Sequence, residues 1–200
     1  GTVFIWHGRL PRHRRVLFQV PRRRHSNLPA ATFLGQSYAL AIRTRTNTYT
    51  ELACFLFTRD FVTRTDANIF KCAGLSVNYY KYLDSTGVGF DYDGMLADLK
   101  AVPAGAVVLL HACAHNPTGV DPTQEQWKQI CATLKARPDV AIFFDSAYQG
   151  FASGNAEDDA FAMRLFVSEG VPFALAQSFA KNFGLYGERV GVLSMITHDK

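Results

Sequence analysis

The stretch that decides the fold reads Val171-Pro-Phe-Ala-Leu-Ala-Gln177 and continues as Ser178-Phe-Ala-Lys-Asn-Phe-Gly-Leu-Tyr-Gly-Glu-Arg189. Its first half has the length and bulk of a buried strand. Lys181 follows the strand-ending serine by three positions, among aromatic residues and glycines. A lysine in such an apolar setting loses hydration, which disfavours its ammonium form and leaves a nucleophilic amine. Ser178 and Arg189 can hold a phosphate by hydroxyl hydrogen bond and charge. The segment therefore predicts chemistry on an aldehyde beside a phosphate.

Alternating strand and helix patterns surround this stretch from residue 68 onward. Short apolar runs bounded by turn residues indicate strands, and apolar residues at helical spacing indicate helices. The expected elements are a helix end at Asn68–Ala73, a strand at Val77–Leu83, a helix from Asp91, a strand at Ala106–His111, a helix capped by Asp121 with Pro122 at its first position, a strand at Val140–Phe144, a helix at Ala156–Ser168 and a strand at Val190–Ile196. This alternation predicts an α/β fold with a mostly parallel sheet flanked by helices.

Polar side chains follow three of the expected strands. Asn116 lies in the loop after one strand, Asp145 ends the next and precedes Tyr148, and Ser178 ends the strand before Lys181. In a mostly parallel sheet, ligands bind beyond the carboxyl ends of the strands. We therefore expect these side chains to lie together at one edge of the sheet.

Each of these residues also has an ordinary structural explanation. Asp145 can serve as a helix cap, Tyr148 as a half-buried aromatic residue and Asn116 as a turn residue. His111 and His115 are four apart, as metal ligands on a helix would be, but they flank a strand end. We therefore expect no metal site.

Taken together, the polar residues fit one cofactor, pyridoxal 5'-phosphate. Its aldehyde would lie on Lys181, its phosphate on Ser178 and Arg189, its ring nitrogen beside Asp145, and its phenolic oxygen beside Asn116 and Tyr148. A carboxylate beside the pyridine nitrogen keeps it protonated, which makes the ring an electron sink. The lysine, once displaced by the substrate amine, is placed to move a proton to or from the substrate α-carbon.

Three longer motifs contain these residues. They read His111-Ala-Cys-Ala-His-Asn-Pro-Thr-Gly119, Phe144-Asp-Ser-Ala-Tyr-Gln-Gly-Phe-Ala-Ser-Gly154 and Gln177-Ser-Phe-Ala-Lys-Asn-Phe-Gly-Leu-Tyr-Gly-Glu-Arg-Val-Gly191. In their order and spacing they resemble the aspartate aminotransferases, in class I of the fold-type I pyridoxal-phosphate enzymes. The resemblance covers residues 68–200 and implies that they form part of the large cofactor-binding domain.

The resemblance also implies a role for each site residue. It makes Lys181 the Schiff-base lysine, puts Asp145 at the ring nitrogen, Tyr148 and Asn116 at the ring oxygen, Ser178 and Arg189 at the phosphate, and a cis peptide bond before Pro117. The implied reaction moves an amino group between L-aspartate and 2-oxoglutarate, giving oxaloacetate and L-glutamate. The implied assembly is a homodimer whose active sites are shared between subunits. We expect a cytoplasmic or mitochondrial protein with no membrane or nucleic-acid partner.

The sequence departs from the family pattern at several places. Family members have a Trp-x-Asn-His stretch just before the residues that match Ile69 and Phe70, whereas Thr63, Thr65 and Asp66 stand there in this chain. The family's Ser-Gly-Thr phosphate turn is not recognisable in residues 1–67. The arginines that hold the substrate carboxylates in the family find no counterpart either. We therefore expect an incomplete domain that is inactive by itself.

Residues 1–67 also differ from the rest in charge. They contain eleven Arg, no Lys and three acidic residues, a net charge of +8, which the overall net charge of +4 conceals. Clusters at Arg12–Arg15 and Arg22–Arg24 can bind a nucleic acid or an acidic surface. An Arg-rich, acid-poor segment is also typical of organellar targeting. The complete bias to Arg favours a third explanation, that this stretch is not native coding sequence.

The remaining signals concern the compartment and the class of function. No apolar run approaches the roughly 18 residues of a membrane span. The four cysteines, Cys54, Cys72, Cys113 and Cys131, show no CxxC spacing and stand among apolar neighbours, which predicts reduced, buried thiols in an intracellular protein. Two other functions stay open. One is a sister aminotransferase that prefers aromatic amino acids, and the other is a non-enzymatic remnant whose basic arm binds a polyanion.

Overall fold

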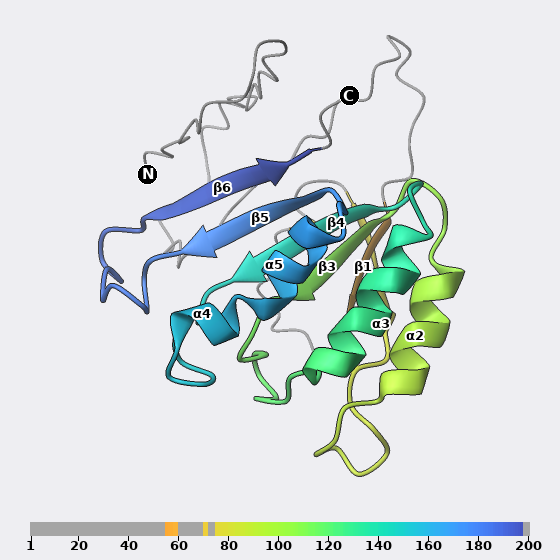
Figure 1. The fold of residues 1–200 in the computed structure, drawn as a ribbon, viewed down its shortest axis with the longest axis horizontal. Helices are drawn as coiled ribbons and strands as arrows, with labels where there is room; N and C mark the ends of the chain where they lie inside the picture. Colours follow the sequence, from red (N-terminus) through yellow and green to blue (C-terminus); the bar gives the residue numbers. More distant parts are fainter. Residues whose placement is uncertain (1–54, 60–69, 72–74, 198–200) are drawn as a thin grey trace, which may run out of the picture.

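The structure, a computed structural model, describes residues 55–59, 70–71 and 75–197. They form one six-stranded sheet in the order β2-β1-β3-β4-β5-β6 (Figure 1). The strands are β1 (Phe55–Arg59), β2 (Ser76–Tyr80), β3 (Val107–His111), β4 (Ala141–Ser146), β5 (Phe173–Ser178) and β6 (Gly191–Ile196). The first five strands are parallel, and β6 is antiparallel to β5. The expected α/β fold with a mostly parallel sheet is therefore confirmed.

Helices pack on one face of the sheet (Figure 1). They are α2 (Tyr92–Ala101), α3 (Gln124–Lys135), α4 (Ala156–Asp159) and α5 (Phe161–Ser168). Side chains alternate along β3, so that Val108 and Leu110 join the core under the helices while Val107 and Leu109 join a smaller cluster on the opposite face. Trp127, Ile130, Cys131 and Leu134, spaced i, i+3, i+4 and i+7 along α3, form its buried face.

An aromatic cluster joins the two strands that lead to the predicted site. The Phe144 ring of β4 meets the Phe173 ring of β5 at 5.1 Å and the Phe166 ring of α5 at 5.0 Å, both edge to face. Trp127 of α3 lies 6.1 Å from the same ring. Such pairs contribute about 0.5–1.5 kcal/mol each beyond their buried area. The cluster thus fixes β4 and β5 side by side beneath the helices.

β1 lies in a part of the chain where the sequence shows only weak apolar signals, at Leu52–Phe57. Its backbone pairs with β2 from Phe55 to Arg59 and with β3 at Leu56 and Phe57. A parallel strand pairs with strands that are distant in the sequence. The sequence of β1 alone therefore gives little indication that it is a strand. The sheet therefore begins before residue 68.

Several predicted boundaries need correction. The strand predicted at Val77–Leu83 ends at Tyr80, and Leu83 forms only an isolated bridge with Phe90. The single helix predicted at Ala156–Ser168 is two helices, because the backbone leaves helical geometry at Ala160 (φ −85°, ψ 3°). The sequence does not predict this break, because no glycine or proline occurs at this point. Of the predicted helix end near residue 70, only Phe70 and Lys71 are described, and both are helical.

Asp121 does not cap the helix that follows it, as the sequence predicted. Thr123 is the N-cap of α3, and its hydroxyl accepts a hydrogen bond from the Gln126 N–H at 3.3 Å. The Gln126 side chain in turn accepts one from the Thr123 N–H at 2.8 Å, which completes a capping box. The Asp121 carboxylate is engaged elsewhere, in the loop after β3.

The cysteine and membrane predictions are tested in part. Cys113 and Cys131 are free and buried, as expected, whereas Cys54 and Cys72 lie outside the described residues. Burial raises the pKa of the Cys113 thiol to about 12, with Asp159 and Asp121 acting in the same direction. This thiol is therefore a poor nucleophile at neutral pH. No helix within the described residues is long and apolar enough to cross a membrane.

Candidate active site

The carboxyl ends of β3, β4 and β5 lie side by side at one edge of the sheet. His111 at the end of β3 pairs with Asp145 of β4, and Asp145 pairs with Ala176 of β5. β5 ends two residues later, at Ser178, which pairs with Gly191 at the start of β6. The loops after these three strands therefore leave from the same edge, and between them they carry Asn116, Tyr148, Lys181 and Arg189.

The loop after β3 has an unusual backbone that the partly buried carboxylate of Asp121 holds. The Asn116–Pro117 peptide bond is cis, as expected, and Ala114 has a left-handed φ of 45°. A residue with a side chain rarely adopts that conformation, so the surrounding contacts must enforce it. Asp121 accepts hydrogen bonds from the N–H groups of Ala114 at 2.6 Å and His115 at 2.9 Å. These charge-assisted bonds fix the backbone immediately before Asn116.

Aromatic packing holds the same loop from the other side. The imidazole of His115, which is 1% exposed, stacks on the Tyr82 ring at 3.9 Å. Its Nδ1 lies 2.6 Å from the Thr118 hydroxyl, and the Tyr82 hydroxyl donates to the Val120 carbonyl at 2.7 Å. His115 is thus part of the packing under the loop, and no group of residues suited to a metal ion occurs in the described part of the chain.

Asp145 lies beside His111, one of the two histidines for which the sequence predicts no metal site. His111 Nε2 is 3.9 Å from Asp145 Oδ2, and both side chains are largely buried. The carboxylate remains 19% exposed. Asp145 can thus meet a ligand at the sheet edge while His111 flanks it. Only the folded structure shows this partnership, because the two residues are far apart in the sequence.

Three predicted site residues from three different loops meet above this edge. Asn116 Nδ2 donates a hydrogen bond to the Tyr148 hydroxyl at 3.4 Å. The Lys181 ammonium lies over the Tyr148 ring, 4.6 Å from its centre, where the negative face of the ring attracts a cation. Since the phenol accepts from Asn116, it keeps its own proton for donation to a ligand.

Ser178 and Arg189 stand at the two ends of one loop. Hydrogen bonding between the Phe179 N–H and the Val190 carbonyl, at 3.1 Å, closes the loop and brings its ends together. The Ser178 hydroxyl is buried and accepts from the Ala180 N–H at 3.3 Å. Arg189 has a left-handed φ of 55°, and its exposed guanidinium donates to the Tyr186 carbonyl at 3.1 Å. A non-glycine residue in that conformation costs roughly 1–2 kcal/mol, which marks this turn as a functional candidate.

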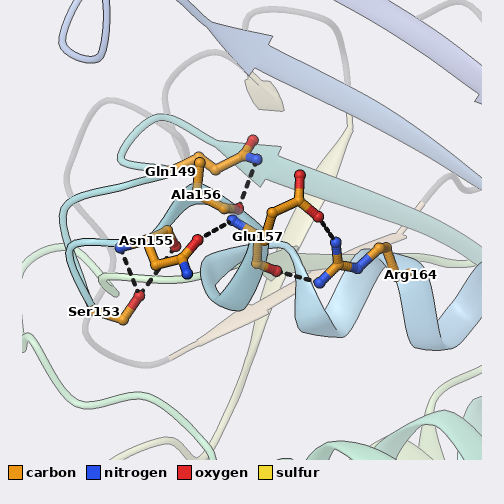
Figure 2. A network of polar contacts seen from close by, with 6 residues as sticks. All are labelled: Gln149, Ser153, Asn155, Ala156, Glu157 and Arg164. Carbon is orange, nitrogen blue, oxygen red and sulfur yellow. Dashed lines mark hydrogen bonds and ion pairs between the residues drawn. The ribbon is translucent and has the colours of Figure 1, made fainter.

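The loop after β4, which carries Tyr148, is fixed at its next residue. Gln149 accepts a hydrogen bond from the Gln177 side chain of β5 at 2.5 Å and donates to the Ala156 carbonyl at 3.0 Å. Figure 2 shows how this contact continues into the start of α4, where Asn155 caps Glu157 and Ser153 bonds to Asn155. These glutamines gave no functional signal in the sequence, because each acts only through a partner brought close by the fold.

Comparisons with known proteins show which family this chain resembles. A family model described as aminotransferase class I and II matches residues 67–198. The cytoplasmic aspartate aminotransferase of Oryza sativa subsp. japonica is 56% identical over 128 residues, which are 64% of this chain and 31% of the rice protein. The mitochondrial enzyme of Xenopus tropicalis is 53% identical over 131 residues, or 66% and 30% of the two chains. This chain thus spans about a third of the length of these curated relatives.

Solved structures give the same family. A putative aspartate aminotransferase from Leishmania major Friedlin has a TM-score of 0.70 and 46% identity, over 73% of this chain and 37% of its own. An aromatic-amino-acid aminotransferase from Burkholderia pseudomallei, covalently bound to pyridoxal phosphate, has a TM-score of 0.69 and 44% identity, over 74% of this chain and 36% of its own. The match of sequence and fold over most of the described residues shows that this chain belongs to the class I and II aminotransferase family.

Proposed function

We propose that residues 68–200 supply the cofactor-binding part of an enzyme that transfers an amino group between L-aspartate and 2-oxoglutarate, giving oxaloacetate and L-glutamate. One observation carries the proposal. Lys181, Tyr148 and Asn116 come from different loops and meet at the sheet edge where the Asp145 carboxylate is partly exposed. The substrate assignment is supported by the aspartate aminotransferases of rice and Xenopus tropicalis, which are 56% and 53% identical over the matched residues.

The residues at this edge fit pyridoxal 5'-phosphate, on which the family depends. They offer an amine at Lys181, a carboxylate at Asp145, a phenol at Tyr148, and a hydroxyl and a guanidinium at the joined ends of the Ser178–Arg189 loop. Each of these groups complements one polar part of the cofactor. When bound, pyridoxal phosphate supplies an electron sink for the charge that develops at the substrate α-carbon.

Lys181 is proposed as the residue that carries the cofactor and moves the proton. Its Nζ projects over Tyr148 from the loop after β5, so it lies where the other loops converge. With the cofactor bound, the Lys181 amine would take the proton from the substrate α-carbon and deliver it to the cofactor. The fold would contribute to the rate by holding this amine close to both the substrate α-carbon and the cofactor.

Tyr148 and Asn116 are proposed to act on the phenolic oxygen. The Asn116 amide donates to the Tyr148 hydroxyl, which directs the phenol proton towards the ligand. A hydrogen bond donated to the anionic form of that oxygen stabilises it, because a preorganised donor does not have to reorient during the reaction. Asp145, flanked by His111, is proposed to stabilise the positive charge on the ring nitrogen.

A preference for aromatic amino acids is the second candidate function. The Burkholderia cenocepacia aromatic amino acid aminotransferase has a TM-score of 0.70 and 45% identity, close to the values for the Leishmania major aspartate enzyme. A broad-specificity aminotransferase from Leishmania mexicana, with a TM-score of 0.70 and 48% identity, resembles the chain as well. The cofactor edge is therefore compatible with either substrate, and the substrate preference has to be measured.

The remaining proposals concern organisation. We propose that residues 1–67 are a separate segment that precedes the part of the chain matched by the family model. Within this segment, β1 contributes a strand to the sheet. We also propose a homodimer with shared active sites, located in the cytoplasm or in mitochondria. The compartments follow those named for the rice and Xenopus tropicalis relatives.

A hybrid enzyme tests the proposed function. Residues 67–198 of this chain replace the matching segment of the rice enzyme, which supplies the rest of the protein. We expect the hybrid to form oxaloacetate from aspartate and 2-oxoglutarate in a coupled assay, whereas the 200-residue polypeptide alone shows no turnover. The ratio of aspartate to phenylalanine turnover, compared with that of the parent, reports what this segment adds to specificity. A folded hybrid with no aminotransferase activity on either substrate would contradict the proposal.

A further inference from the structure

A buried carboxylate lies behind the loop that carries Tyr148. Asp159, the last residue of α4, is 5% exposed and belongs to no predicted contact with a ligand. It accepts four hydrogen bonds from the turn that follows Tyr148. The donors are the N–H groups of Gly150 at 2.7 Å, Ala152 at 3.0 Å and Ser153 at 3.0 Å, and the Ser153 hydroxyl at 2.6 Å.

The turn that Asp159 holds begins at Tyr148 itself. The Phe151 N–H donates to the Tyr148 carbonyl at 2.9 Å, so the peptide of Tyr148 is the first member of the turn. Gly150 has a φ of 94°, a conformation open to glycine but strained for other residues. Gln149 is tied to β5 by the Gln177 side chain. The backbone of Tyr148 is thus held on one side by β4 and on the other by this turn.

The charge of Asp159 matters to this arrangement. Burial alone would raise the pKa of the carboxyl group, but the Ser153 hydroxyl and the three backbone N–H groups outweigh it, so the pKa lies below its usual value. Asp159 is therefore ionised at neutral pH and accepts charge-assisted hydrogen bonds, which are roughly twice as strong as neutral ones. Since the folded-state pKa is lowered, this stabilisation is present above the unfolded value and is lost as the pH falls through the folded one.

We propose that Asp159 is a positioning residue that sets where the Tyr148 phenol meets the ligand. It does so by fixing the turn after Tyr148, so that the hydroxyl reaches Asn116 and the ring lies under Lys181. The inference rests on the proposed function, because it assigns Tyr148 to the phenolic oxygen of pyridoxal phosphate. Asp159 itself touches neither cofactor nor substrate in this account.

The proposal predicts a spectroscopic effect. A phenol that donates to the anionic oxygen lowers the pH at which the bound cofactor loses its proton, so losing that donor raises the midpoint. We expect Tyr148→Phe to raise the pH midpoint of the absorbance change of bound pyridoxal phosphate by about one unit, the size of one hydrogen bond to a charged group. We expect Asp159→Ala to produce at least half of that shift, although the other titratable groups near the phenol, Lys181, His111 and Asp145, are unchanged.

The experiment is a double-mutant cycle on the full chain loaded with pyridoxal phosphate. If Asp159 acts through Tyr148, adding Asp159→Ala to Tyr148→Phe shifts the midpoint little further, because the two changes remove the same interaction. Asp159→Asn, which keeps one oxygen acceptor, should shift it less than Asp159→Ala. Asp158→Asn is the matched control, since Asp158 is the exposed neighbour in α4 with the same charge, and should leave the midpoint unchanged.

The outcomes separate this inference from the proposed function. A lower Tm with an unchanged midpoint in both Asp159 variants, or additive shifts in the double variant, would overturn the positioning role while leaving the cofactor site intact. An unmodified chain that binds no pyridoxal phosphate would overturn both. Should Asp159→Ala fail to fold, Ser153→Ala tests the same point, because it removes the shortest of the four hydrogen bonds and must raise the midpoint in part.

Discussion

Replacing Lys181 by alanine in the hybrid enzyme is expected to lower kcat for aspartate by about 10⁴-fold or more. The change removes both the amine that carries the cofactor and the base that moves the α-proton, and a positioned base alone contributes about 10²–10⁴-fold. The ring of Tyr148, over which Lys181 lies, should remain in place, so the Tm should change little. Initial rates of oxaloacetate formation, with Tm measured in parallel, test the prediction.

The matched control for this variant is Lys128→Ala. Lys128 lies on the exposed side of α3, where its ion pair with Glu125 is open to solvent. Exposed ion pairs of this kind contribute about 0–1 kcal/mol, so the control should keep its activity. A Lys181 variant that retained more than about a tenth of the wild-type rate would contradict the assignment. Loss of a positioned base should lower the rate by about 10²-fold or more.

Replacing Asp145 by asparagine is expected to cost the hybrid about 3 kcal/mol of transition-state stabilisation, or roughly 10²-fold in kcat/KM. The substitution keeps the size of the side chain and removes the charge that favours a protonated ring nitrogen. His111, 3.9 Å away, cannot replace that charge, since a protonated imidazole has the opposite sign. The measurement is kcat/KM for aspartate at a pH where the wild-type hybrid is fully active.

Asp93→Asn provides the control for the loss of one negative charge. Asp93 is an exposed residue in the first turn of α2, where a carboxylate contributes about 0.3–1 kcal/mol to the helix and nothing to the site. Turnover of the Asp145 variant within about tenfold of the wild type would show that the carboxylate does not have this role.

The sequence predicts which strand ends lie together because each candidate site residue lies on or soon after a strongly apolar strand. Asp145 and Ser178 stand at the ends of β4 and β5, and the parallel packing of such strands brings their ends together whatever the details of the loops. The alternating pattern of strands and helices thus locates Lys181 and Tyr148 before any contact is known.

The sequence does not show which acidic side chains turn back to hold a loop. Asp121 precedes a proline and reads as a helix cap, but Thr123 and Gln126 form the cap, and Asp121 binds the backbone before Asn116. Asp159 reads as one of several acidic residues favourable at a helix start. Local patterns indicate where a polar residue can cap a helix. They do not show that a distant loop competes for the same carboxylate.

β1 illustrates the other limit of prediction. Its five residues show no alternation that would distinguish a strand from a short helical piece, and its neighbours in the sheet, β2 and β3, are later in the chain. The stability of a parallel strand comes from pairing across the sheet, so it cannot be read from the strand alone. The departures at Thr63, Thr65 and Asp66 lie outside the described residues, and their effect on the site remains a prediction from the sequence.

Reduction of the full chain with borohydride in the presence of pyridoxal phosphate tests whether Lys181 carries the cofactor. The reagent converts a lysine that carries the cofactor into a stable secondary amine, which peptide mapping locates. We expect Lys181 to be labelled well above the other six lysines of the chain, because, of the lysines that the structure describes, only Lys181 lies where Asp145, Tyr148 and Asn116 converge. A label spread evenly over the seven lysines, or absent from Lys181, would contradict the account.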